Sequence, residues 1–398
     1  MIEILTAAVG SVAARLRAAP VERKAHGHAL VAIEALRPPQ WSGRDYAAFA
    51  REGFMQNAVV YRAVRMIAEG AAAVPLVCYD GDRELDGHAV AALLAAPNSA
   101  QGRADFVETG LGHLLVGGNL FINAVAVGGV IRELHALRPD RVRVLEGTSG
   151  WPGGYEYAAD GASIRLAGEA VPGVGRVLHV RQFHPLGDLE GLSPVAAAAF
   201  AIDIHNAASR WNKALLDNAA RPSGALVYSG GGTLAPEQFE RLKGELADSF
   251  QGAGNAGRPL LLEGGLDWKA MGLTPHDMDF IDAKNAAARE IALAFGVPPM
   301  LLGIPGDNTY ANYQEANRTL WRQTILPALT RLCDALAAWL QPAFDVARLR
   351  IVPDLDRVDA LAAEREALWA RLERSTFLTI DEKRQALGYA PIVGGDRL

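Results

Sequence analysis

The residues of this sequence that come nearest to a nucleophilic site lie in Gly191-Leu192-Ser193-Pro194-Val195. A catalytic serine on the sharp strand-to-helix turn of an α/β-hydrolase needs a second glycine two positions further on, where this sequence has valine. Proline directly after serine instead fits a helix start, with Ser193 as the N-cap and Pro194 at the first helical position. The segment is therefore predicted to begin a helix and not to carry acyl-transfer chemistry.

The candidate metal ligands are scattered as well. His179 and His184 flank one predicted strand at an odd separation, which puts the two rings on opposite faces. Asp277, Asp279 and Asp282 precede or begin a predicted helix, whose N-terminal dipole attracts carboxylates; a metal site is the minor alternative. No phosphate-binding glycine loop and no His-Glu-x-x-His pair occurs. We therefore predict a protein that is not an enzyme and that needs no metal or cofactor.

Composition narrows the function further. The chain has 398 residues, enough for two or three modules, and 50% of them are hydrophobic, as in globular proteins. The formal net charge is −6, whereas a protein that grips nucleic acid through its phosphates is basic. Two cysteines, Cys78 and Cys333, cannot build a disulfide framework. No apolar run reaches the ~18 residues of a spanning helix, so a soluble cytoplasmic protein is expected.

The first half of the chain alternates short helices with hairpin signals. Residues 1–40 are interpreted as a flexible arm, and a helix is predicted over Asn57–Ala73 with asparagine as its N-cap. Strands follow around the turn pairs Asp80-Gly81, Gly128-Gly129 and Asp160-Gly161. This pattern predicts a mixed α+β body and not the alternating units of a parallel sheet.

The second half contains longer helices. Pro194–Ala219 and Asp279–Phe295 are predicted helices, with short strands and a loop at Gly252–Gly257 between them. Thr309–Leu340 can form one helix of about thirty residues. We expect this helix to bend at Pro327, because proline removes a backbone hydrogen bond inside a helix.

A short β-prone segment follows this helix. Arg348–Val352 has strand character, and Asp356–Arg374 is predicted to form a charged helix. A long helix, a small β segment and a returning helix make a projection that is too extended to be stable alone. Neighbouring copies of the chain are therefore predicted to complete its surface.

Short motifs in a fixed order resemble those of the portal proteins of tailed bacteriophages. The branch is the one typical of long-tailed phages, which includes the portals of gene transfer agents. No motif is specific alone, but together they span roughly residues 45–396. They are Asn57–Ala68 with Pro75 and Tyr79, Leu93–Asn98, Gly117–Phe121, Gly191–Pro194, Asn218 with Pro222 and Gly224, Leu261–Gly264, Gly296–Gly303, Thr309–Asn312 with Glu315, Thr324–Pro327, Leu378–Glu382, Gly388–Pro391 and Gly394–Asp396.

The resemblance implies a virion structural protein. A ring of about twelve copies at one capsid vertex would be the conduit for DNA packaging and ejection, assembled in the bacterial host cytoplasm. The large terminase ATPase, a head–tail adaptor and the major capsid protein would be its partners. Double-stranded DNA would pass without sequence-specific binding, and no membrane would be involved. A gene transfer agent is slightly favoured over a phage. A different head–neck adaptor and an unrecognised hydrolase remain alternatives.

The family's portal fold can be mapped onto this sequence. It implies a hairpin-rich α/β wing, a two-helix stem, a small β-containing clip and little or no crown. The predicted parts are an arm at 1–40, the wing at 41–308, a stem helix at 309–340 bent near Pro327, the clip at 341–355, a second stem helix at 356–374, and a tunnel-loop region with a C-terminal wing segment at 375–398.

Three groups of site residues follow from this map. The basic side chains expected near the DNA channel are Arg371, Arg374, Lys383 and Arg384. The clip residues expected to pair with neighbouring subunits and dock partners are Arg348, Leu349, Arg350, Ile351 and Val352. The stem residues expected to face neighbouring subunits are Leu332, Leu336 and Trp339.

Overall fold

The computed structural model describes residues 42–147, 151–217, 224–228, 237–238, 240–241, 266–270, 280–306, 310–389 and 391–397. The chain divides into two compact units, residues 41–223 with 271–398 and residues 1–40 with 224–270. In the smaller unit, strands β11 (Gly224–Tyr228) and β12 (Leu266–Ala270) pair antiparallel. The predicted arm at 1–40 lies outside the described residues.

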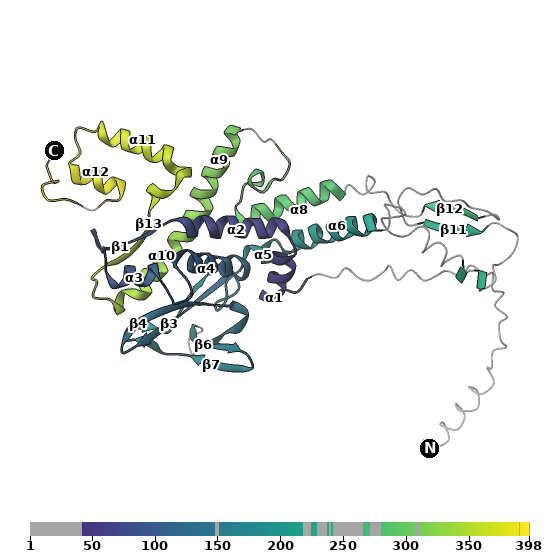
Figure 1. The fold of residues 1–398 in the computed structure, drawn as a ribbon, viewed down its shortest axis with the longest axis horizontal. Helices are drawn as coiled ribbons and strands as arrows, with labels where there is room; N and C mark the ends of the chain where they lie inside the picture. The colour runs from purple at the N-terminus through teal and green to yellow at the C-terminus, as the bar shows by residue number, and fades with distance from the viewer. Residues whose placement is uncertain are drawn as a thin grey trace, which may run out of the picture. The chain divides into compact units, whose positions relative to one another are not determined.

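The larger unit mixes helices with small antiparallel sheets, in agreement with the predicted α+β class (Figure 1). Its elements are α1 (Tyr46–Ala48), the π-helical η1 (Phe49–Met55), α2 (Ala58–Ala73), β1 (Leu76–Asp80), β2 (Arg83–Glu84), α3 (Ala89–Ala95), α4 (Arg103–Gly117), β3 (Asn119–Val127), β4 (Val130–Leu137), η2 (Pro139–Arg141), β5 (Val142–Glu146), β6 (Pro152–Ala159), β7 (Ala162–Leu166), β8 (Glu169–Val171), β9 (Val174–Gly175), β10 (Val177–Arg181), α5 (Pro194–Ala197), α6 (Ala199–Asp217), α8 (Phe280–Phe295), η4 (Pro299–Leu302), α9 (Tyr310–Leu320), the π-helical η5 (Trp321–Ile325), α10 (Leu326–Leu340), η6 (Gln341–Ala343), β13 (Leu349–Pro353), η7 (Leu355–Arg357), η8 (Asp359–Leu361), α11 (Ala362–Glu373) and α12 (Ile380–Leu387). Among the described helices, none is long and apolar enough to cross a membrane.

Helix α2 connects several other helices. Its N-cap is Asn57, as predicted, whose Oδ1 accepts hydrogen bonds from the N–H groups of Val59 and Val60. The Asn57 Nδ2 also donates to Asn206 Oδ1 at 2.9 Å, which ties the start of α2 to α6. The apolar residues of α2 are buried, and the helix packs against α4 and α8. The buried amide of Asn57 thus caps α2 and bonds to α6 at the same time. This double contact holds α6 in a fixed position relative to α2.

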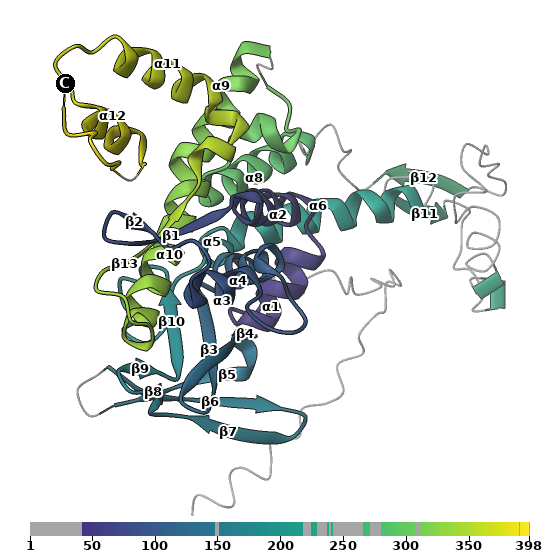
Figure 2. The ribbon, with the colours of Figure 1, turned by 60° about the vertical axis from the view of Figure 1, so that its left-hand side comes forward.

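Two three-stranded sheets form around the predicted hairpins. Strand β3 pairs with β4 and β10, and β6 pairs with β5 and β7, all antiparallel. Gly128 and Gly129 turn the first hairpin with positive φ, and Asp160 and Gly161 turn the second. Figure 2 shows the β6–β7 hairpin at the lower end of the unit, with β7 outermost.

The helix predicted over 309–340 is interrupted directly before Pro327. Helix α9 ends, the π-helical η5 follows, and α10 begins one residue before the proline. A π-helical turn fits a site where one backbone N–H is missing. Thr324 Oγ1 donates to the carbonyl of Gly296 at 2.7 Å, and Ile325 lies so near Gly70 that a Cβ there would sit 2.9 Å from its Cδ1. These contacts hold the irregular turn against α2 and the end of α8.

The C-terminal helices are held mainly by polar contacts. Glu364 on α11 lies 3.4 Å from Arg318 of α9 and 3.4 Å from Arg322 of η5. Arg365 forms an ion pair with Asp356. Among the described residues of α11 and α12, only Leu372 is buried.

The Gly117–Phe121 motif has a clear structural reason. Gly118 ends α4 with a φ of 74°, and a Cβ at this position would lie 2.3 Å from the backbone oxygen of Gly191. The Gly118 carbonyl accepts from Gln182 N–H, and Asn119 Oδ1 accepts from Gly191 N–H. Two motifs that are distant in sequence therefore meet at one close backbone contact.

We expect Gly118→Ala to lower the free energy of unfolding by about 3 kcal/mol or more, through left-handed strain and backbone collision. Gly128 also has positive φ, but a Cβ there meets nothing within 4 Å. Gly128→Ala should therefore cost only about 1 kcal/mol. Urea unfolding of both variants measures the difference, and equal losses would contradict the close contact.

Candidate functional site

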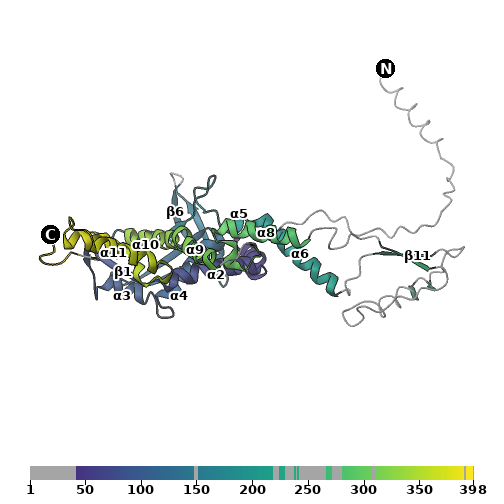
Figure 3. The same ribbon diagram turned by 90° about the horizontal axis from the view of Figure 1, so that it is seen from above.

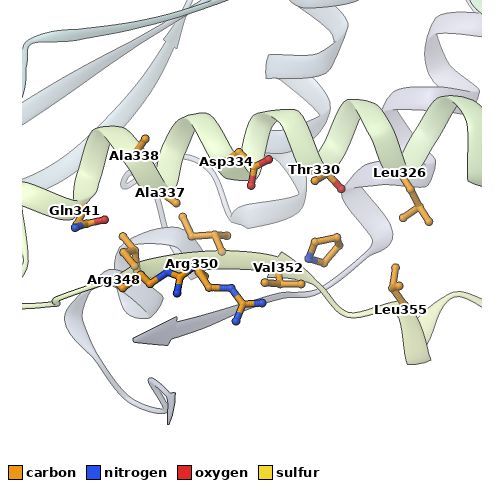
Figure 4. Close-up of a pocket in the computed structure, with 13 residues that line it drawn as sticks. Leu326, Thr330, Asp334, Ala337, Ala338, Gln341, Arg348, Arg350, Val352 and Leu355 are labelled. Carbon is orange, nitrogen blue, oxygen red and sulfur yellow. The ribbon is translucent and has the colours of Figure 1, made fainter. Parts of the chain in front are cut away.

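A groove of about 600 Å³ lies between helix α10 and strand β13. The two elements run in opposite directions, because Gln341 lies beside Arg348 at one end and Leu326 beside Leu355 at the other (Figure 4). All five residues predicted to dock partners, Arg348–Val352, line this groove. The predicted docking segment therefore borders a groove, although only Arg348, Arg350 and Val352 of its side chains reach the surface.

Strand β13 already has a partner within its own chain. It runs antiparallel to β1, with Leu76 opposite Pro353 and Asp80 opposite Leu349. Leu349 and Ile351 are buried in the core of the larger unit. The prediction that neighbouring subunits must supply the partners of this strand is therefore wrong for one of its two edges. Its β-propensity was visible in the sequence, whereas its partner lies far earlier in the chain and was not.

In the part of the chain that the structure describes, no strand pairs with the second edge of β13. The sheet order is β13-β1-β2, so β13 is an outer strand. The N–H of Asp354 donates to the carbonyl of Pro75, which identifies the even-numbered residues as those that bond to β1. Leu349 and Ile351 therefore direct their N–H and C=O groups away from β1, and Pro353 directs its C=O the same way. This is an unpaired row of backbone donors and acceptors.

The side chains around this edge carry charges of both signs. The guanidinium of Arg350 lies 5.8 Å from the centre of the Tyr79 ring and donates to the carbonyl of Gly81 at 3.1 Å. Arg350 is thus held against its own sheet. On α10, Asp334 is exposed and has no ion-pair partner in the described part of the chain. A cationic side chain that entered the groove would meet this carboxylate.

The predicted stem residues are mostly inside the protein. Leu332 and Leu336 of α10 are each only 1% exposed, in the same core as β13 and α2. The Nε1 of Trp339 donates to the carbonyl of Gly175 at 2.7 Å within the chain. The prediction that Leu332 and Leu336 face neighbouring subunits is therefore wrong. A stripe of apolar residues on a helix shows that one face is covered, but not whether the same chain covers it.

A different pair of helices carries exposed apolar side chains. Helices α6 and α8 pack side by side (Figures 1 and 3). Phe200 and Ile204 of α6, and Ile281 and Leu293 of α8, are exposed, with Leu293 at 80% and Ile281 at 73%. In the sequence, residues 224–270 of the smaller unit lie between these two helices. Sequence reasoning found both helices but did not recognise the insertion, and the predicted loop at Gly252–Gly257 lies outside the described residues.

Comparison with known proteins decides the family. The profile described as phage portal protein matches residues 58–388. The chain belongs to the phage portal protein family. The portal protein of Enterobacteria phage HK97 is 26% identical over 87% of this chain and 81% of its own length.

Two solved structures are more similar to this portal chain. One is the neck of an empty gene transfer agent particle computed with C6 symmetry, 54% identical, with a TM-score of 0.68. The other is the neck of a native particle computed with C12 symmetry, 53% identical, with a TM-score of 0.66. Each comparison covers 89% of this chain and 96% of the other. The predicted family and fold are confirmed.

Membership of the portal family makes this chain a structural protein and not an enzyme. Ser193 caps α5, accepting from Ala196 N–H at 2.9 Å, as predicted. His179 is stacked on Phe121 at 4.2 Å, and burial lowers its pKa to about 4, so that its ring is neutral near pH 7. Within the described residues no group of His, Cys, Asp or Glu could hold a metal ion. Asp277 and Asp279 lie outside the described residues.

The basic residues predicted near the DNA channel lie on the C-terminal helices of the portal chain. Arg371 and Arg374 are exposed at the end of α11, and Lys383 and Arg384 are half-buried on α12. Arg384 lies 5.6 Å from the centre of the Tyr389 ring. These two helices contact each other, so the four charges share one region. Their contact with DNA remains a prediction.

Truncation of two leucines tests where α10 is buried. Leu336→Ala should lower the free energy of unfolding of the monomeric chain by about 2–5 kcal/mol, because it leaves a cavity in the core. Leu293→Ala removes the same atoms from an exposed position and should change that energy by less than about 0.5 kcal/mol. Urea unfolding at concentrations too low for assembly gives both values. A neutral Leu336→Ala would mean that α10 is not covered by its own chain.

Proposed function

We propose that this portal chain forms a ring of about twelve copies at one vertex of a gene transfer agent particle. The ring is the conduit through which double-stranded DNA enters and leaves. The observation that carries the proposal is the 54% identity with a chain from the neck of such a particle, over 89% of this chain and 96% of that one. The related neck computed with C12 symmetry supports the copy number.

The insertion between α6 and α8 changes the assignment of stem and clip. We place the two-helix stem at α6 and α8, and the clip in residues 224–270. With residues 1–40 they make up the smaller of the two units, and the flanking helices expose Ile204, Ile281 and Leu293, which contacts between subunits would cover. The earlier assignment to 309–340, 341–355 and 356–374 fits less well, since α10 and β13 belong to the core of the larger unit. The larger unit up to α6 then forms most of the wing.

The acidic composition suits a passage for DNA. Each chain carries a net charge of −6, so a ring of about twelve chains is strongly negative. Each phosphate that a lysine or arginine neutralises adds affinity, and tight binding would slow a strand that must slide. Arg371, Arg374, Lys383 and Arg384 supply at most weak, sequence-independent contacts in this proposal. Residues 375–398 keep their assignment to the tunnel-loop region and a C-terminal wing segment.

The partners follow from the place of the ring in the particle. The clip is the part that docks the large terminase ATPase during packaging and the head–tail adaptor afterwards. The wing contacts the major capsid protein. No group for nucleotide hydrolysis was found in this sequence, so the energy for DNA movement must come from the terminase.

The size and shape of the purified protein test this function. Native mass spectrometry should give a species near twelve times 42.4 kDa, and negative-stain microscopy should show rings with a central channel.

Ile281→Asp and Leu293→Asp should each prevent ring closure, because a carboxylate would be buried between apolar stem helices. Val127→Asp, at an exposed site in the β3–β4 hairpin, is the matched control and should leave rings intact. A wild-type chain that stays monomeric at every concentration would contradict the proposal.

A further inference from the structure

The groove beside β13 offers an incomplete sheet. Leu349 and Ile351 present free N–H and C=O groups there, and Pro353 a free C=O. Proline is tolerated at this place because its missing N–H faces the open edge and not β1. Helix α10 stands off from this edge, and its small side chains Ala337 and Ala338 line the space between. A strand edge beside a helix is a common receptor for one additional extended segment.

We propose that the open edge of β13 receives strand β7 of a neighbouring copy of this chain. The proposal rests on the proposed ring, because the ring supplies the second copy. A closed ring needs a head-to-tail interface, in which two unlike and complementary surfaces of the same chain meet. Two outer strands of different sheets satisfy this condition.

Strand β7 has the features that such a partner needs. It is the outer strand of its sheet, and four of its five residues are exposed, with Ile164 at 57%. The two-residue turn between Ala159 and Ala162 makes these two residues a hydrogen-bonded pair. Ala162, Ile164 and Leu166 therefore bond to β6. Ser163 and Arg165 direct their backbone groups outward, at the same spacing as Leu349 and Ile351.

Charge selects one register between the two strands. Residues that lie opposite each other in a sheet share a face, so Arg165 opposite Ile351 points to the side on which α10 lies. Ile351 lies between Arg350 and Val352 in the strand, and Figure 4 shows these two residues facing the part of α10 that carries Asp334. Arg165 lies opposite Glu156 of β6 and interacts with its charge, but no carboxylate in the described part of the chain lies within 4 Å of it, so Asp334 would be a second acidic neighbour. In this register Ser163 donates to the carbonyl of Pro353, and Ile164 lies opposite Val352.

Cross-linking tests this register directly. In the double variant Val352→Cys/Ile164→Cys, the two cysteines form a non-hydrogen-bonded antiparallel pair with Cα atoms about 4.5 Å apart, within disulfide range. Mild oxidation of assembled rings should give a ladder of covalent oligomers on non-reducing gels. The native Cys78 and Cys333 are buried, with pKa values raised to about 11 and 12, and should not react. Val352→Cys/Val130→Cys, with an exposed residue of another hairpin, should give no ladder.

Charge reversal supplies an independent test. Asp334→Arg and Arg165→Asp should each raise the chain concentration for half-assembly about tenfold, because each places like charges together. The combination of both should return it close to the wild-type value. If the double variant instead needed a higher concentration for half-assembly than either single variant, the pairing of Arg165 with Asp334 would be contradicted.

The outcomes separate this pairing from the ring itself. Rings that form normally but give no ladder would overturn the β7–β13 pairing and leave the proposed function standing. Absence of rings from the wild-type chain would overturn the proposed function. A photo-cross-linker attached to the cysteine of the Val352→Cys variant captures the neighbouring segment, and mass spectrometry identifies the captured peptide. A peptide from residues 1–41, or from any segment other than β7, would also overturn the pairing.

Discussion

The burial of one helix face determines how the rest of this chain is arranged. Leu329, Leu332, Leu336 and Leu340 of α10 are all at most 1% exposed. Each buried leucine contributes about 2 kcal/mol relative to an exposed one. Their cover comes from β13 and from α2, and β13 in turn pairs with β1. Helix α10 and strand β13 are therefore joined to α2 and β1 of the body, and are not part of a projection that other copies must stabilise.

This arrangement leaves other surfaces for assembly. Helices α6 and α8 pack on each other but expose Phe200, Ile204, Ile281 and Leu293. Phe200 already lies under the guanidinium of Arg44, so the side chains left for a neighbouring copy to cover are Ile204, Ile281 and Leu293. The same argument applies to the open edge of β13, where backbone groups lack partners. A ring satisfies both needs with one type of neighbour, because each copy meets the next through unlike faces.

The sequence predicted local structure better than it predicted which segments pack against each other. Caps at Asn57 and Ser193 and the hairpin turns depend on neighbouring residues, and the structure confirms them; the predicted bend at Pro327 stays a prediction, although a π-helical turn precedes the proline. The ordered motifs also identified the family. The apolar stripe of α10 was assigned to the wrong neighbour, because periodicity gives a buried face but not the chain that buries it. The pairing of β13 with β1 is a long-range contact with no local signal.

Hydrogen exchange of the monomeric chain tests the central claim most directly, namely that α10 and β13 belong to the core of each protomer. Backbone amides of α10, and those of Arg350 and Val352 that bond to β1, should exchange as slowly as those of α2 before any ring has formed. The amides of Leu349 and Ile351 should exchange quickly, since they face the open edge. Fast exchange throughout α10 and β13 in the monomer, with protection gained only in the ring, would contradict the account.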